Sequence, residues 1–305
     1  MTTIITKNSS TAGDVPATSE LVQGELAVNV TDKKLYTKNS SGAVVSLVSS
    51  LDSNNSIGTG NVTLGSNAGD SLTSNNSYNT LIGNDAGKNL AGTSNGYVAV
   101  GYKALENSAT SSGGGVAIGY LALQNSNATN FTTAVGWGAG KNATTGGLSS
   151  TFIGNGAGMG ITTGSQNTCI GFDANPTSAT ASYQFTLGST DIQTLRCNQT
   201  SITSLSDARD KTDIVDTPYG LDFINTLKPR QFKWDTRDGN IKDGTLEQGF
   251  IAQELLESAN GNNNSLNLVL EDNPNKLEAS AGNLIPLLVK AVQELSARVV
   301  ELETK

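Results

Sequence analysis

The sequence has no histidine, only two cysteines, Cys169 and Cys197, and few aromatic residues, which make up 5% of the chain. Without histidine the chain cannot build a Ser-His-Asp triad, and a zinc site lacks its usual ligands. Two cysteines do not form a disulfide framework. The composition therefore predicts no metal site and no cofactor, and among serine nucleophiles it leaves only those activated without histidine.

Charge is scarce in the middle of the chain, and no basic cluster occurs anywhere. Residues 56–200 carry nine charged side chains, the last 100 residues carry 28, and the formal net charge is -8. Phosphate binding needs clustered Lys and Arg, so nucleic acid is not an expected partner. The N-terminus lacks the apolar core of a signal peptide, and no apolar run approaches membrane-spanning length. We expect a soluble protein made in a cytoplasm, without membrane insertion.

What the chain has in quantity is glycine, 34 residues, and much of it is periodic. Eight glycines, each preceded by Leu, Ile or Val, follow one another at spacings of 17 or 18: Gly65, Gly83, Gly101, Gly119, Gly136, Gly154, Gly171 and Gly188. An alanine stands three residues after each of them except the last. This pattern predicts one short buried strand per repeat, with the glycine at a bend or a close approach of backbones.

The repeat length bears on the architecture of residues 56–200. A single-chain left-handed β-helix needs an aliphatic residue every six positions, and stepping from Leu64 gives Asp70 and Asn76. Because one strand per repeat is not expected to enclose a core alone, we expect an intertwined homotrimeric β shaft. The "VAIG" repeats resemble the left-handed β-roll heads of trimeric autotransporter adhesins and the repeat shafts of phage tail fibres.

Four of the eight residues that follow these glycines are aromatic: Tyr102, Tyr120, Trp137 and Phe172. One interpretation is a sugar-binding ladder. The favoured interpretation is that these aromatic residues, two positions after the aliphatic residue, lie on the same side of the strand as that residue. They would then pack inside the shaft or between chains. Cys169 occupies a strand position held elsewhere by Ala, Thr, Leu or Phe, which favours a small buried hydrophobe.

The two ends of the chain read differently from the middle. Residues 1–55 alternate apolar and polar residues around turns at Asp32-Lys33 and Ser41-Gly42, which predicts β-hairpins. In residues 201–305, "PYGLDFINTLKPRQFKW" predicts a helix stopped by Pro229 and then a strand. "EQGFIAQELLESA" predicts a strand leading into a helix. The expected fold class is mainly β, with a C-terminal α+β domain.

The last helix carries a heptad pattern over residues 284–305. Its apolar seam consists of Ile285, Leu288, Val292, Leu295, Val299 and Leu302, with Lys290, Glu294, Arg298 and Glu301 on the flanks. The pattern predicts a short coiled coil. An amphipathic helix packed on its own domain is the alternative, and the mixture of Ile, Val and Leu leaves dimer and trimer open.

The boundary between the shaft and the C-terminal domain holds a possible nucleophile and base, Ser206 and Lys211. A serine hydroxyl attacks a carbonyl only if a base takes its proton, and lysine serves when burial disfavours its charged form. A Ser-Lys pair five positions apart also occurs by chance in most proteins.

"SDARDKTDI", followed by "GLDFINTLKPRQFKW", "QGFIAQELLE" and a terminal heptad helix, resembles the peptidase S74 family, the intramolecular chaperone domains of phage tail spikes and fibres. The resemblance covers residues 206–305. It implies that three such domains assemble, template the shaft and then cut themselves off between Leu205 and Ser206. By position it makes Ser206 the nucleophile and Lys211 its base, with Asp207 structural or orienting. Asp210 departs from the apolar residue of many members, and its charge beside Lys211 is expected to weaken cleavage.

The N-terminal "GELAVNVTDKKLYTK" resembles a segment common in phage tail proteins. Together these resemblances imply a phage tail fibre or spike in the virion, bound to tail or baseplate proteins at its N-terminus and to a host surface receptor, glycans included. A bacterial trimeric surface adhesin is one alternative, and a fibre that keeps its C-terminal domain uncut as a permanent trimerisation tip is another. An enzyme acting on host polysaccharide is disfavoured, because the repeats contain only five acidic residues: Asp70, Asp85, Glu106, Asp173 and Asp191.

Overall fold

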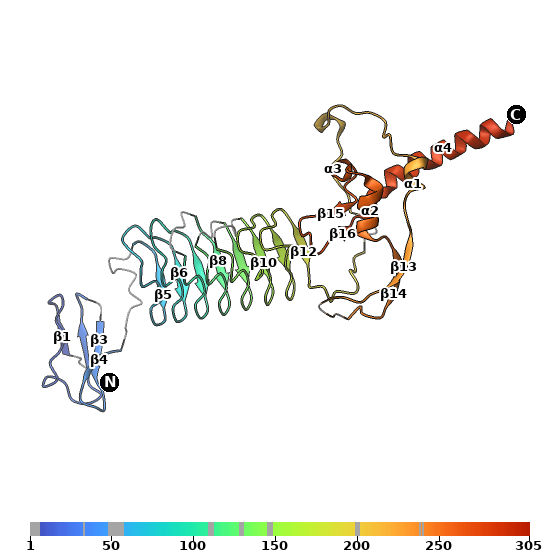
Figure 1. Cartoon of the computed structure of the whole chain (residues 1–305). Helices are drawn as coiled ribbons and strands as arrows, with labels where there is room; N and C mark the ends of the chain where they lie inside the picture. Colours follow the sequence, from blue (N-terminus) through green and yellow to red (C-terminus); the bar gives the residue numbers. More distant parts are fainter. Residues whose placement is uncertain are drawn as a thin grey trace.

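The structure is a computed structural model that describes residues 7–32, 34–47, 58–108, 113–127, 131–144, 149–198, 202–237, 239 and 241–305. Its elements form a small N-terminal sheet, an elongated β-solenoid and a C-terminal α+β domain (Figure 1). The domain boundaries predicted at residues 55 and 200 lie outside the described residues, and so does Lys33 of the first predicted turn.

The N-terminal sheet has four strands in the order β1-β2-β3-β4. They are β1 (Lys7–Ser9), β2 (Leu26–Asn29), β3 (Lys34–Lys38) and β4 (Val44–Ser46). The pairs β2–β3 and β3–β4 are antiparallel, as the two predicted hairpins require, and β1 adds parallel to β2. The core of this sheet is small and consists of Leu21, Ala27 and Tyr36.

The middle of the chain winds as a solenoid whose eight strands form one parallel sheet in sequence order. The strands are β5 (Val62–Leu64), β6 (Thr80–Ile82), β7 (Val98–Val100), β8 (Val116–Ile118), β9 (Thr133–Val135), β10 (Thr151–Ile153), β11 (Thr168–Ile170) and β12 (Phe185–Leu187). Each strand pairs with the next one exactly one repeat later, for example Ala117 with Ala134. The prediction of one short strand per repeat is confirmed.

Each strand ends at the repeat glycine because two backbones come very close there. Gly136 has φ 138°, and a Cβ atom at this position would lie 2.3 Å from the carbonyl oxygen of Gly154. A side chain is therefore excluded both by the backbone conformation and by the contact between coils. The regular spacing of glycines in the sequence is therefore a consequence of the stacking of the coils.

The solenoid encloses its own core, so the expectation of an intertwined shaft is wrong. Most of the fully buried side chains come from three positions of the repeat: the middle of the inner strands, such as Phe152, the alanine three residues after the glycine, such as Ala157, and the residue seven after it, such as Leu90. The second wall of the coil consists of turns rather than a strand. Because alanines line it, the two walls lie close enough for one chain to close a dry core.

The aliphatic residue before each glycine points out of the solenoid, although the sequence predicted a buried strand. Because side chains alternate across a strand, burial of the middle residue places its neighbours outside. Several of these residues are 36 to 56% exposed. They form a row along the sheet, called here the outward stripe: Leu64, Ile82, Val100, Ile118, Val135, Ile153, Ile170 and Leu187.

The C-terminal domain is built from short elements around a compact core. They are η1 (Ala208–Asp210), α1 (Leu221–Ile224), β13 (Arg230–Lys233), β14 (Leu246–Gly249), α2 (Ala252–Ala259), α3 (Asn263–Leu266), β15 (Val269–Leu270), β16 (Glu278–Ala279), η2 (Ala281–Leu284) and α4 (Ile285–Glu303). The predicted helix before Pro229 and the strands and helix that follow are confirmed. Leu255, Leu268 and Leu287 lie in the core, and β13–β14 and β15–β16 are antiparallel pairs.

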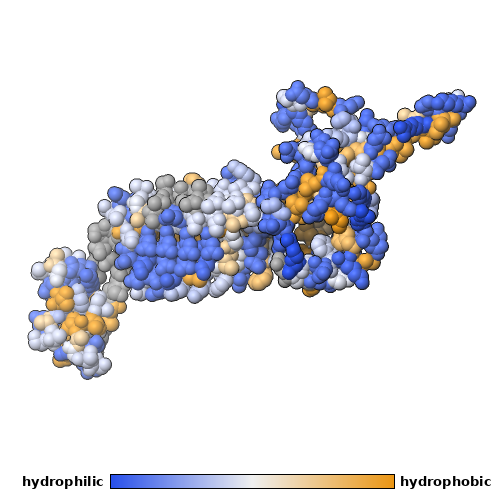
Figure 2. All heavy atoms as spheres, in the orientation of Figure 1, coloured by the Kyte–Doolittle hydropathy of each residue, from blue (hydrophilic) through white to orange (hydrophobic). Residues whose placement is uncertain are grey.

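Helix α4 packs on its domain with one face and leaves the heptad seam uncovered. Leu287 and Ala291 are buried, and Glu294 Oε2 accepts a 2.7 Å hydrogen bond from the backbone nitrogen of Leu221. All six seam residues are exposed. The helix projects away from the domain, and Figure 2 shows hydrophobic side chains along it. The seam therefore does not pack on its own domain, contrary to the alternative interpretation.

We expect Gly136→Ala to lower the free energy of unfolding of the shaft by roughly 2 kcal/mol more than Gly96→Ala. Both glycines have positive φ, so both variants carry backbone strain, but a Cβ atom at Gly96 meets no atom within 4 Å. Thermal or denaturant unfolding of the two variants measures the difference. Equal destabilisation would show that the contact with Gly154 is not limiting.

The two cysteines are expected to react at very different rates. Burial raises the pKa of the Cys169 thiol to about 11, whereas Cys197 is exposed. At pH 8 only about one Cys169 thiol in a thousand is then ionised, and reagents must also enter the core. A thiol-specific reagent should titrate one thiol in the native chain and two after denaturation. Rapid reaction of both in the native chain would remove Cys169 from the core.

Candidate functional site

Ser206 and Lys211 lie on an extended, exposed segment, residues 202–216, called here the dyad loop. Its only regular element is the single 3₁₀ turn η1. Asp207 caps this turn, because its carboxylate accepts a 2.9 Å hydrogen bond from the backbone nitrogen of Arg209. The backbone nitrogen of Lys211 closes the turn on the carbonyl of Ala208 at 3.2 Å.

The turn brings the predicted nucleophile and base together. Lys211 Nζ donates a hydrogen bond to Ser206 Oγ across 2.5 Å. A neutral amine in the same place can accept the hydroxyl proton instead, which is the contact that general-base catalysis needs. The spacing of five residues thus corresponds to one capped 3₁₀ turn.

Asp207 binds Arg209 rather than the dyad. Its Oδ2 atom accepts a 2.6 Å hydrogen bond from the Arg209 guanidinium, and hydrogen bonds to Arg209 lower the pKa of the Asp207 carboxyl. The structural or orienting role of Asp207 stays a prediction. Within the described residues, Asp210 forms no ion pair with Lys211, so its charge does not replace Ser206 as the partner of the amine.

One chain supplies the dyad but not its surroundings. Among the described residues, every hydrogen bond of residues 206–213 ends inside that same segment. Leu205 and Ile202 are both almost completely exposed. Proton transfer to lysine and stabilisation of an oxyanion both require a desolvated, preorganised site. The loop of a single chain provides neither.

The aromatic residues do not pack inside the shaft, so that part of the favoured interpretation is wrong. Tyr102, Tyr120 and Trp137 are exposed and stack on one another, with ring centroids 5.2 and 6.1 Å apart and interplanar angles of 19° and 8°. Stacked rings cover each other's faces, and a sugar binds best to an open face. Packing between chains and sugar binding at the ends of the stack both stay predictions.

Two of the five acidic residues of the shaft form ion pairs with lysine. Asp85 lies 3.4 Å from Lys88, and Glu106 lies 3.0 Å from Lys103. In the part of the chain that the structure describes, no group of three or more Cys, Asp or Glu side chains could hold a metal ion. The same part contains no helix of the length and apolarity needed to cross a membrane.

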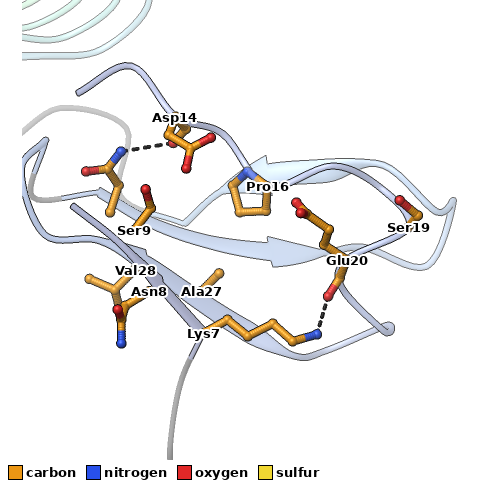
Figure 3. Close-up of a pocket in the computed structure, with 10 residues that line it drawn as sticks. Lys7, Asn8, Ser9, Asp14, Pro16, Ser19, Glu20, Ala27 and Val28 are labelled. Carbon is orange, nitrogen blue, oxygen red and sulfur yellow. Dashed lines mark hydrogen bonds between the residues drawn. The ribbon is translucent and has the colours of Figure 1, made fainter. Parts of the chain in front are cut away.

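The N-terminal sheet has a pocket of about 460 Å³ beside β1 and β2 (Figure 3). Its walls combine the aliphatic side chains of Pro16 and Ala27 with the polar groups of Lys7, Asp14 and Glu20. The Lys7 ammonium group binds the backbone carbonyl of Glu20, as the dashed line in the figure shows. The pocket lies in the segment predicted to dock on the virion.

Sequence reasoning did not find the contact between the shaft and the C-terminal domain. Gln184 Nε2 donates to Asp272 Oδ2 across 2.8 Å, and Asn273 Nδ2 donates to the carbonyl of Thr177 across 2.7 Å. These partners are 88 and 96 residues apart in sequence. No periodicity or motif links positions so distant, and only the fold brings them together.

Comparison with known families gives one match. The model of the peptidase S74 family, described as a chaperone of endosialidase, matches residues 206–260 and begins at Ser206. No protein with a curated description matches the chain, and no solved structure does. The family match and the β-solenoid together fit a fibre protein with a C-terminal chaperone.

Proposed function

We propose that the chain is the fibre or spike protein of a phage tail, whose C-terminal domain templates a homotrimer and then cuts itself off between Leu205 and Ser206. The observation that carries the proposal is the 2.5 Å contact between Lys211 Nζ and Ser206 Oγ, at the residue where the family match begins. A dyad on an exposed turn, between a β-solenoid and a C-terminal domain, suits a reaction performed once on the chain itself.

In the proposed reaction, neutral Lys211 takes the hydroxyl proton of Ser206 while Oγ attacks the carbonyl carbon of Leu205. The peptide C–N bond breaks, the acyl group moves to Oγ, and the departing Ser206 amine takes the proton from Lys211. Water then hydrolyses the ester. The net change consumes one water molecule and leaves a Leu205 carboxylate and a free Ser206 amine.

Two apolar surfaces of the single chain support assembly into a homotrimer. The outward stripe runs along the shaft, and the heptad seam runs along α4. Both are long apolar rows of a kind that soluble proteins rarely leave exposed, and both repeat with the regularity of an interface between identical chains. Peptidase S74 chaperone domains work in trimeric fibre proteins, which is compatible with three copies here.

Assembly would also supply the desolvated surroundings that the dyad loop of a single chain lacks. Neighbouring copies would desolvate Lys211 and cover the apolar side chains around Leu205, so cleavage would follow correct assembly. In the virion, the N-terminal sheet would attach to tail or baseplate proteins, and the shaft would face the host receptor. A fibre that keeps its C-terminal domain uncut is the second candidate, favoured by the full exposure of the dyad in one chain.

The dyad assignment predicts that Ser206→Ala and Lys211→Ala each reduce self-cleavage to less than about one hundredth of the wild-type rate. Denaturing gels should show two fragments for the wild type and one full-length band for both variants. N-terminal sequencing of the small fragment should begin Ser-Asp-Ala-Arg. Ser204→Ala is the matched control and should still cut. Cleavage of either dyad variant at the wild-type rate would exclude the assignment.

The trimer proposal predicts three chains per particle by light scattering. Ile153→Asp and Ile170→Asp place a charge in the outward stripe, and each should shift the particles toward single chains because a buried unpaired carboxylate is strongly unfavourable. Asn125→Asp adds the same charge on the turn-rich wall and should leave the trimer intact. A monomeric wild type, or equal behaviour of all three variants, would contradict this interface.

A further inference from the structure

The chain between the last shaft strand and the proposed cut is one repeat long. The repeat glycines from Gly65 to Gly188 are spaced by 17 or 18 residues, and Ser206 stands 18 residues after Gly188. Leu205 and Ser206 therefore occupy the places that the aliphatic residue and the glycine would hold in one more coil.

Other positions of this segment also fit the repeat. Leu195 stands seven residues after Gly188, and the residues seven after earlier repeat glycines include the buried Leu72, Leu90 and Ile161. Ser204 would be the middle residue of the new strand, where the outermost strands β5 and β12 carry threonine. Asp191 replaces the usual alanine, which an end coil tolerates because one side of it faces water.

In the structure the segment is not wound. Its described residues, 189–198 and 202–205, form no strand, and Leu195 is 68% exposed. Gly188 has φ 71°, whereas the seven preceding repeat glycines have φ between 116° and 138°. The chain therefore leaves the solenoid path at Gly188, and Figure 1 shows the dyad loop standing away from the end of the shaft.

The place where a further coil would lie is open. A cavity of about 780 Å³ lies between β12 and the β15–β16 pair, lined by Phe185, Thr186 and Leu187 on one side and Leu270 and Glu278 on the other. β12 is the terminal strand of the sheet, and a terminal strand presents unpaired backbone groups that favour addition of another strand.

We propose that cleavage releases residues 189–205 to wind as the final coil of the shaft. A strand over residues 203–205 would pair parallel with β12, with Thr203 opposite Phe185, Ser204 opposite Thr186 and Leu205 opposite Leu187. The proposal rests on the proposed self-cleavage, which makes Leu205 the new C-terminus.

The cut separates the coil from Ser206, which stands where every earlier repeat has a glycine. In an uncut coil, Ser206 would stand at the place of a repeat glycine, and all eight repeat glycines have a positive φ, between 71° and 138°, which a residue with a Cβ atom rarely adopts. A chain that ends at Leu205 carries no such residue. The freed segment can then bury Leu195 and pair with the backbone of β12. The hydrogen bonds from Gln184 to Asp272 and from Asn273 to Thr177 would break.

Hydrogen–deuterium exchange tests the proposal on the full chain. In the self-cleaved protein, amides of residues 194–198 and 203–205 should exchange at least about 100-fold more slowly than in the uncut Ser206→Ala protein, because the new strand protects them. Equal exchange in the two proteins, whether fast or slow, would overturn the proposal.

A matched pair of variants tests the register. Leu195→Asp should abolish the protection, because the proposed coil buries this side chain. Thr194→Asp should retain it, because the residues one place earlier in the repeat, such as Asn89 and Asn125, are exposed. Protection that survives Leu195→Asp would rule out this register.

A third protein separates this proposal from the proposed function. A Ser206→Ala chain with the recognition sequence of an added protease inserted after Leu205 is cut on demand. If the wild type fails to cut itself, the self-cleavage proposal is wrong. The same exchange measurement after cleavage by the added protease still tests whether residues 189–205 form the final coil. Protection on cutting supports it, and continued fast exchange excludes it.

Discussion

The close approach of backbones at the repeat glycines is the constraint on which the shaft depends. A Cβ atom at Gly136 would lie 2.3 Å from the carbonyl oxygen of Gly154, so the coils stack at this spacing only where no side chain intervenes. The same spacing brings the strand wall and the turn wall together. Small residues such as Ala117 and Ala122 then fill the interior, and one chain closes a dry core.

The uniformity of this construction creates a difficulty of register. Each strand pairs with a neighbour 17 or 18 residues away, and the repeats are so alike that a slipped pairing is nearly as good as the correct one. If the outward stripe is an interface, neighbouring chains must also be aligned along the shaft, and no single coil determines that alignment. A C-terminal domain with its own core and a projecting heptad helix can supply both an end point and an alignment.

The end of the shaft and the dyad are linked through the same repeat. Gly188 is the last glycine on the solenoid path, and the proposed scissile bond follows one repeat later. Asp272 and Asn273 occupy the end of the shaft meanwhile. A domain that caps the last coil while the chain is tethered, and that cuts at a coil boundary, would leave a product whose final strand is complete.

The sequence alone determined the glycine period, the single strand per repeat, the position of Ser206 and Lys211, and the heptad seam of α4. These features depend on the spacing of residues along the chain, which can be read directly from the sequence. It could not decide which side of each strand faces inward, because both alternating positions of "VAIG" are apolar. Only the tertiary structure showed that the middle residue is buried, because it places the turn wall, with its alanines, against that side of each strand. Likewise, the contact of Gln184 with Asp272 joins residues 88 positions apart, and folding alone brings them together.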